Sequence, residues 1–347
     1  MEIKDEIAIS LVETLRPKIK LDKLDSYGEL PSKAVKDMSG DDFEQYITEW
    51  LYTVYQGKKY HTGKKGDGGV DHIILTENDE LEYIQCKREK GVSGEFTEEI
   101  VKTLNNVRRG LFPMPKRYRY VATNGVPSKW AGFLEQGNMK EKLLMWYRNQ
   151  DLYEKEAYEG FEEWMKGKEL PEIDLVDINR VYTEHLKGPY GFLRFGNKIG
   201  IERKESSREN ENGMHYIREI LKAYSEHLGK HIDIEDLKDE KRLAEDLERQ
   251  KSSYYSAEGL RITANEYLEE EEFGKLKEEI YDGIIENLNR NHADGYDRML
   301  DTLTKATHVE LDAVGLSKRY ELVNVKDRKG ICHMLVEDRR FGWCNDE

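Results

Sequence analysis

The 347 residues of the chain predict an α/β domain that is followed by a mainly helical domain. Between residues 38 and 150, segments with helical periodicity alternate with short apolar runs typical of strands, which is the pattern of a layered α/β fold. Beyond about residue 150, Tyr, Glu, Lys and Leu dominate, and most segments keep the helical period. A chain of this length suggests two domains, or one domain with a large appendage.

The elements of the first part are marked by capping and turn residues. Residues 1–37 are expected to form one amphipathic helix, with Ile7, Leu11 and Leu15 at helical spacing, and then a polar connector. Ser39 has the residue type and position of a helix N-cap, and acidic residues follow it in the first turn. The sequence next predicts a turn rich in Gly and Lys at 57–69, strands at 70–76 and 81–87, a helix at 97–109, a strand at 118–123 and a helix at 129–136.

The second part reads as a series of helices that ends in a hairpin. Helices are expected at 214–229, 235–256, 258–268, 273–289 and 294–306, after a polar linker at 205–213. From Tyr320 on, apolar and polar residues alternate around a turn at 327–330, which predicts a closing β-hairpin. The predicted domains are an N-terminal helix and connector at 1–37, the α/β domain at 38–150, a helical connector region at 151–234 and a C-terminal domain at 235–347.

The charge of the chain is unevenly distributed. The formal net charge is −15, yet residues 38–150 hold 17 Lys and Arg against 16 Asp and Glu. The remaining residues hold 38 basic against 54 acidic side chains. The first part can therefore approach a polyanion such as DNA without strong repulsion, whereas most of the second part cannot. This asymmetry indicates that the two parts have different roles.

Composition also excludes some classes of protein. No apolar run approaches the roughly 20 residues that a membrane-spanning helix needs. Residues 1–20 mix acidic side chains into an amphipathic pattern, which is not that of a signal peptide. Three cysteines in so long a chain form neither a disulfide framework nor a CxxC pair. We therefore expect no membrane association and a reducing, cytoplasmic location.

Two nearby stretches carry the residues that indicate chemistry. They are Gly66-Asp67-Gly68-Gly69-Val70-Asp71 and Tyr83-Ile84-Gln85-Cys86-Lys87-Arg88. Side chains alternate along a strand, so Gln85 and Lys87 should share one face while Ile84 and Cys86 point into the core. Asp71 opens the partner strand and can reach the face of Gln85 and Lys87. A carboxylate, an amide and an ammonium group are thus expected to converge.

These three groups suit the hydrolysis of a phosphodiester. Asp71 and Gln85 offer the oxygen ligands that a hard divalent cation prefers, Mg²⁺ by default with Mn²⁺ as the alternative. Lys87 can orient or deprotonate the attacking water and offset charge on the phosphate. Glu44, on the preceding helix, is a further candidate metal or water contact. Basic residues that could hold a DNA backbone are Arg88, Arg108, Arg109, Lys116, Arg117, Arg119 and Lys129.

The same residues resemble a known family. Residues 39–44, the GDGGVD stretch at 66–71 and the YIQCKR stretch at 83–88 closely resemble the Mrr-like restriction endonuclease catalytic domain, which uses a QxK version of the PD-(D/E)xK motif. The resemblance implies a restriction-endonuclease-like mixed sheet flanked by helices, DNA as substrate and a metal cofactor. It also implies catalytic roles for Glu44, Asp71, Gln85 and Lys87.

The C-terminal half carries a second resemblance. It rests on Ser252 to Arg261, on the apolar spacing from Phe273 to Ile284, on Asp327 to Val336 and on Trp343. These segments resemble the C-terminal domain of effectors in ABC three-component systems of the Lamassu type of antiphage defence. The resemblance implies assembly with an SMC-like ABC ATPase and a small middle subunit. The chain has no Walker motif, so ATP hydrolysis would come from a partner.

Three functions remain open at this point. The first is an effector endonuclease that cuts double-stranded DNA when a partner complex releases it, as a homo-oligomer because one active site cuts one strand. The second is a stand-alone restriction enzyme whose C-terminal half reads modified bases, although groove-reading domains are usually basic. The third is a catalytically silent DNA-binding or assembly subunit, which the intact Asp71, Gln85 and Lys87 disfavour.

Overall fold

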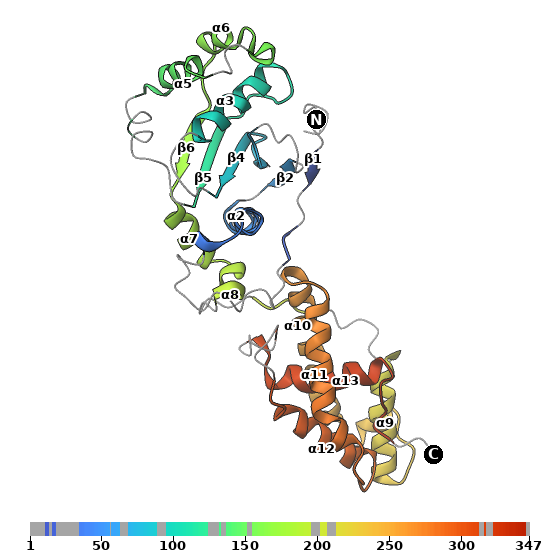
Figure 1. Cartoon of the computed structure of the whole chain (residues 1–347). Coiled ribbons are helices and arrows are strands. Elements are labelled where there is room, and N and C mark those ends of the chain that lie inside the picture. The colour runs from blue at the N-terminus through green and yellow to red at the C-terminus, as the bar shows by residue number, and fades with distance from the viewer. Residues whose placement is uncertain are drawn as a thin grey trace. The chain divides into compact units, whose positions relative to one another are not determined.

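The computed structural model divides the chain into two compact units, each with its own buried core (Figure 1). It describes residues 11–13, 16–18, 35–55, 57–62, 69–88, 95–123, 132, 137–150, 155–195, 202–206, 213–311, 316 and 322–344. The first unit comprises residues 1–17 and 27–191, and the second comprises residues 18–26 and 192–347.

A mixed sheet forms the centre of the first unit. Its strands are β1 (Leu11–Glu13), β2 (Lys58–Thr62), β3 (His72–Leu75), β4 (Leu81–Lys87), β5 (Arg117–Ala122) and β6 (Glu172–Val176). They lie in the order β1-β2-β3-β4-β5-β6. The first four strands pair antiparallel, whereas β5 pairs parallel to β4 and β6 pairs parallel to β5. The predicted mixed sheet flanked by helices is therefore confirmed.

Helices cover both faces of this sheet (Figure 1). On one side lie α2 (Gly40–Val54) and α7 (Ile178–Leu186), and on the other side lie α3 (Glu95–Arg108), α5 (Met139–Arg148) and α6 (Phe161–Lys166). The predicted N-cap is present, because Ser39 Oγ accepts a hydrogen bond of 3.1 Å from the Asp42 amide. Buried His185 lies 3.0 Å from buried Glu49, a pair that joins α7 to α2.

Besides β6, two strands of the sheet were not predicted, and one predicted helix is wrong where it can be checked. Leu11–Glu13 is strand β1 rather than part of a helix, and Lys58–Thr62 is strand β2 inside the predicted turn. Both are short strands, and they pair with each other although they are remote in sequence, a factor that local periodicity does not report. Most of the other residues of the segment 1–37, of the helix at 129–136 and of the linker at 205–213 lie outside the described residues.

The first unit also extends further than predicted. Strand β6 and helix α7 both belong to it, so the boundary expected at residue 150 is too early. The region 151–234 is consequently divided between the two units, and the chain passes from one to the other within α8 (Pro189–Phe195). Strand β6 was missed because its sequence, EIDLV, carries carboxylates that pair with arginines of β5 instead of an apolar stripe.

The second unit is helical in the part that the structure describes. Its long helices are α9 (His215–Leu228), α10 (Lys241–Tyr267), α11 (Glu271–Leu288), α12 (Gly295–Thr307) and α13 (Val325–Glu337). The helices expected at 235–256 and 258–268 are one helix, α10. None of the described helices combines the length and the apolar character needed to cross a lipid bilayer.

The predicted C-terminal hairpin is wrong, because its residues form helix α13. Asn324 and Asp327 start this helix with a capping box, in which each side chain accepts from the backbone of the other residue. The residues from Gly330 to Val336 are buried, so the segment lacks the polar face that marks an amphipathic helix. Gly330 also allows a close crossing, since a Cβ there would overlap the backbone oxygen of Ser253 on α10.

Candidate active site at the end of strand β4

Asp71 and Gln85 lie side by side at the junction of β3 and β4. The Asp71 amide donates to the carbonyl oxygen of Ile84 at 2.9 Å, which fixes Asp71 beside β4. Asp71 Oδ2 then accepts hydrogen bonds from Gln85 Nε2 at 2.8 Å and from the Cys86 amide at 2.6 Å. The structure therefore brings together two of the three side chains that the sequence suggested as metal ligands, Asp71 and Gln85.

The orientation of the Gln85 amide follows from this contact. An ionised carboxylate accepts hydrogen bonds but donates none, so the amide nitrogen must face Asp71 and the amide oxygen must face away. Gln85 is 1% exposed, and its Oε1 has no hydrogen-bond partner within the described ranges. Leaving a buried acceptor unsatisfied costs about 1–3 kcal/mol, so this oxygen is suited to a ligand.

The donor set fits a hard divalent cation. Asp71 provides carboxylate oxygens, and Gln85 provides an amide oxygen that has no hydrogen-bond partner among the described residues. Hard cations prefer such oxygen ligands. No group of three or more His, Cys, Asp or Glu side chains suited to a metal occurs among the described residues. A metal at this position would therefore depend on the amide oxygen of Gln85 as well as on carboxylates.

Lys87 is held by a carboxylate that the sequence did not single out. Its Nζ lies 3.0 Å from Oε1 of Glu99, whose side chain is 8% exposed while that of Lys87 is 29% exposed. Lys102 lies 3.4 Å from the same Glu99 oxygen. Glu99 is in the first turns of α3, where acidic residues are common, and so nothing in the local pattern distinguishes it from Glu98.

Helix α3 also positions the loop that leads to Asp71. The carbonyl oxygen of Gly69 accepts from Thr103 Oγ1 at 2.9 Å and from the Tyr118 hydroxyl at 3.0 Å. Gly69 has a φ of 87°, and a Cβ there would overlap the backbone oxygen of Glu99. The role of this glycine is thus a close backbone approach to α3.

Glu44 lies on the opposite side of β4 from Glu99. It is half-buried on α2, which packs against the face of β4 that carries Cys86. Burial, followed by the charges of Asp71 and Glu44, raises the pKa of the Cys86 thiol well above its usual value. Cys86 is therefore a buried, unreactive thiol. The carboxylates of Glu44 and Asp71 both lie close enough to this thiol to influence it electrostatically.

The predicted division between an open face and a core face of β4 is only partly correct. Ile84 and Cys86 are buried as expected, but Gln85 is buried as well. Helices cover both faces of the sheet, so the burial pattern of β4 does not alternate. Lys87, at the end of the strand, remains partly accessible.

Several of the basic residues predicted to contact DNA instead stabilise the fold. Arg119 is 4% exposed and pairs with Glu82 at 3.0 Å and with Asp174 at 2.7 Å, so the prediction is wrong for this residue. Arg117 pairs with Glu82 and Glu172. In the register of the sheet, Arg117 lies opposite Glu82, five residues and about 17 Å before Lys87.

The remaining basic candidates differ in their surroundings. Arg108 donates to Asn105 and to the backbone oxygen of Ala157, which ties α3 to the segment that follows α5. Exposed Lys116 lies 3.6 Å from Glu80. Arg88 is half-buried directly after β4, and Arg109 is exposed at the end of α3. Lys129 lies outside the described residues.

Comparison with known families gives two matches that do not overlap. Residues 35–132 match the model of a restriction endonuclease domain, Mrr_cat. Residues 213–343 match the model of C-terminal domain 6 of the ABC-three component systems. Searches of curated proteins and of solved structures gave no match. The first match includes Glu44, Asp71, Gln85, Lys87 and Glu99, and both resemblances inferred from the sequence are confirmed at the level of the family.

Proposed function

We propose that this chain, which joins a restriction endonuclease domain to a C-terminal domain of the ABC three-component systems, is a metal-dependent DNA endonuclease of the PD-(D/E)xK type. The observation that carries the proposal is the contact of Asp71 with Gln85, two residues before Lys87 on one strand. The near-neutral charge of residues 38–150 supports DNA as the substrate.

Asp71 and Gln85, with Glu44 as a further candidate, would hold the divalent cation. Mg²⁺ is the first choice because of the oxygen donors, and Mn²⁺ accepts similar ligands. When bound, such an ion lowers the pKa of a coordinated water and offsets the charge that builds up on the phosphate. The Gln85 amide would present Oε1 rather than Nε2 to the ion.

Lys87 is best suited to act as a positive charge. A carboxylate 3.0 Å away favours the ammonium form of an amine, and only the neutral form can accept a proton from water. Of the two roles open to Lys87, the Glu99 contact therefore favours orientation of the water and phosphate over general base catalysis. Glu99 acts through Lys87, as a positioning residue.

The second unit is proposed to dock and control the nuclease. Residues 213–343 carry 29 acidic against 21 basic side chains, which disfavours a DNA clamp and supports contact with proteins. By analogy with its family, the partners would be an SMC-like ABC ATPase and a small middle subunit of a Lamassu-like antiphage system in the cytoplasm. These partners would hold the nuclease inactive until it is released, and double-strand cleavage would require at least two copies.

The test is nicking of supercoiled plasmid by the full chain with Mg²⁺ or Mn²⁺, alone and together with purified ATPase and middle subunit. Lys87→Ala should slow nicking at least about a hundredfold, because removal of one preorganised charge has effects of this order. Lys102→Ala is the control, since Lys102 contacts the same Glu99 oxygen but lies outside the motif. Equal rates for wild type and Lys87→Ala would refute the proposal. Cleavage by the chain alone that depends on DNA methylation would instead favour a modification-dependent enzyme.

A further inference from the structure

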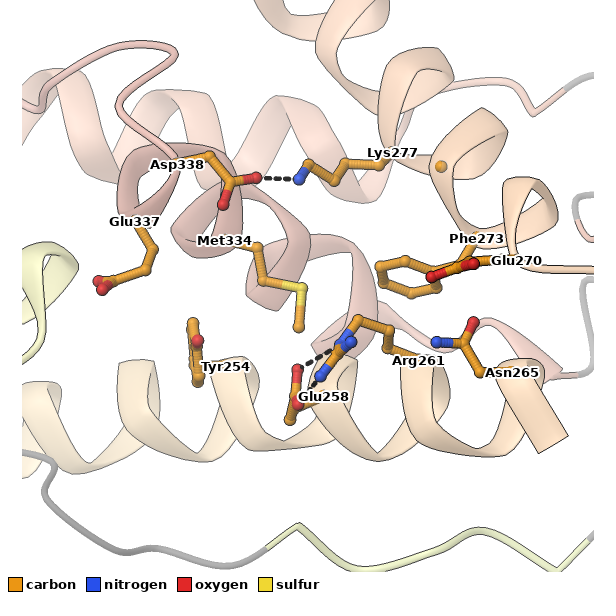
Figure 2. Close-up of a pocket in the computed structure, with 11 residues that line it drawn as sticks. Tyr254, Glu258, Arg261, Asn265, Glu270, Phe273, Lys277, Met334, Glu337 and Asp338 are labelled. Atoms are coloured by element: carbon orange, nitrogen blue, oxygen red, sulfur yellow. Dashed lines mark hydrogen bonds and ion pairs between the residues drawn. The ribbon is translucent and has the colours of Figure 1, made fainter.

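The second unit contains a pocket of about 420 Å³ lined by residues of α10, α11 and α13 (Figure 2). Its apolar lining comes from Tyr254, Phe273 and Met334. In Figure 2 the Met334 side chain lies between Tyr254 and Phe273, above the Glu258–Arg261 pair. The pocket lies within the segment that matches the ABC three-component domain, far along the chain from the candidate active site.

A glycine in the first turn of α11 opens onto this pocket. Gly274 lies in α11, and no described atom lies within 4 Å of a Cβ placed on it. In contrast, a Cβ on Gly283 of the same helix would overlap Val309. Packing against Val309 explains Gly283, whereas Gly274 leaves open space in the wall of the pocket.

The polar groups of the pocket include acceptors in excess. Glu258 pairs with Arg261 and Asp338 pairs with Lys277, which leaves Glu270 and Glu337 without a basic partner among the described residues. Glu337 does accept a hydrogen bond from the Tyr216 amide at 2.8 Å.

Two further observations also indicate a pocket that is rich in hydrogen-bond acceptors and negative charge. The Oδ1 atom of Asn265 is buried and has no hydrogen-bond partner in the described part of the chain. Burial, followed by the charges of Glu258 and Glu337, raises the pKa of Tyr254. The pocket therefore attracts cations and offers acceptors to a donor that enters it.

We propose that this pocket binds an arginine side chain of a partner polypeptide. A guanidinium group is planar and always charged, carries five N–H donors and stacks on aromatic rings. Tyr254 and Phe273 provide the rings, and Glu270, Glu337 and Asn265 provide acceptors. The proposal deepens the docking role given above, because arginine is enriched at protein interfaces and dominates their energetics.

The experiment uses the full chain labelled with ¹³C in its methionine methyl groups. The Met334 resonance is assigned by its loss in Met334→Leu and is followed during titration with N-acetyl-arginine-N-methylamide. A saturable shift in the millimolar range is expected, with no saturable shift for the uncharged glutamine analogue. Gly274→Phe should weaken binding at least about tenfold, since the ring fills the space in front of Gly274. Thr304→Phe, at an exposed position of α12, should leave the titration unchanged.

A second variant keeps the proposal testable if Gly274→Phe misfolds. Glu270 is exposed and its side chain makes no capping hydrogen bond, so Glu270→Lys should preserve the fold and weaken arginine binding severalfold. Equal shifts with the glutamine analogue, or wild-type binding by both Gly274→Phe and Glu270→Lys, would overturn the proposal. The readout does not involve DNA, so a chain that binds arginine but never cuts contradicts the nuclease proposal alone.

Discussion

Lys87 Nζ lies 3.0 Å from Oε1 of Glu99, so the end of strand β4 is joined to helix α3 by a partly buried ion pair. The same helix contacts Gly69, two residues before Asp71, through Thr103. One helix therefore positions both the loop that carries the candidate metal ligand and the candidate catalytic amine.

Glu99→Gln should slow plasmid nicking about tenfold, or about 1.4 kcal/mol in the activation barrier. The amide can still accept a hydrogen bond from Lys87, but it no longer favours the ammonium form by its charge. Glu98→Gln serves as the control, because Glu98 pairs with Lys102 at 2.8 Å. A nicking rate equal to that of the wild type in Glu99→Gln would exclude the positioning role.

Gly69→Ala should destabilise the protein more than Gly110→Ala does. Both glycines have positive φ, 87° and 72°, so both substitutions carry a backbone strain of about 1–2 kcal/mol. Only at Gly69 would the new Cβ also overlap the backbone of Glu99, whereas no described atom lies near the Cβ at Gly110. Chemical denaturation measures the difference. Equal losses of stability would mean that the contact with α3 is unimportant.

Gln85→Glu should make folding dependent on a divalent cation. The substitution places a second carboxylate beside Asp71 in a buried position, where like charges repel strongly. The melting temperature should fall without metal, and Mg²⁺ should raise it more than in the wild type. Gln250→Glu is the control, since Gln250 contacts Asp246 in a similar way in the second unit. If Mg²⁺ restores both variants equally, the effect is not specific to the candidate metal site.

Truncation after Gly191 should leave a folded nuclease, whereas truncation after Gln150 should not. The first cut keeps all six described strands of the sheet. The second cut removes β6, exposes the edge of β5 and deprives buried Arg119 of its partner Asp174. Gel filtration and thermal melting would distinguish a monodisperse, cooperatively unfolding fragment from an aggregate. A stable fragment 1–150 would place the boundary where the sequence suggested.

The stability of the second unit should fall as the pH drops from about 6.5 towards 3. Burial lowers the pKa of His333 from 6.5 to about 3, with a further contribution from Lys329. The unfolded chain therefore binds a proton in this interval that the folded chain does not, and stability decreases with each step down in pH.

His333→Gln should flatten that part of the stability curve. The glutamine amide can still donate to Gln250, which accepts from His333 at 3.1 Å. The same substitution at exposed His231 should leave the slope as in the wild type. A slope that persists in His333→Gln would assign the titration to another group. Urea denaturation at several pH values provides the measurement.

Local sequence alone was enough to predict the central motif. Strand β4 was predicted with its observed ends, Leu81 and Lys87, because strand propensity and turn residues act over a few positions. The Ser39 cap was predicted for the same reason, since a cap involves only neighbouring residues. The adjacency of Asp71 and Gln85 also followed from a hairpin, in which the two strands are close along the chain.

Long-range packing decided the features that the sequence did not predict. Three features depend on contacts between residues that are distant in sequence. They are the pairing of β6 with β5, the burial of α13 on nearly all sides and the ion pairs of buried Arg119. The partner of Lys87 is another such case, because Glu99 and Glu98 are equivalent until α3 packs against the sheet. The sequence by itself determined which groups could perform the chemistry and on which strand they lie. Only the tertiary structure decided which charge each group meets, because the energy of a charge depends on neighbours that folding brings together.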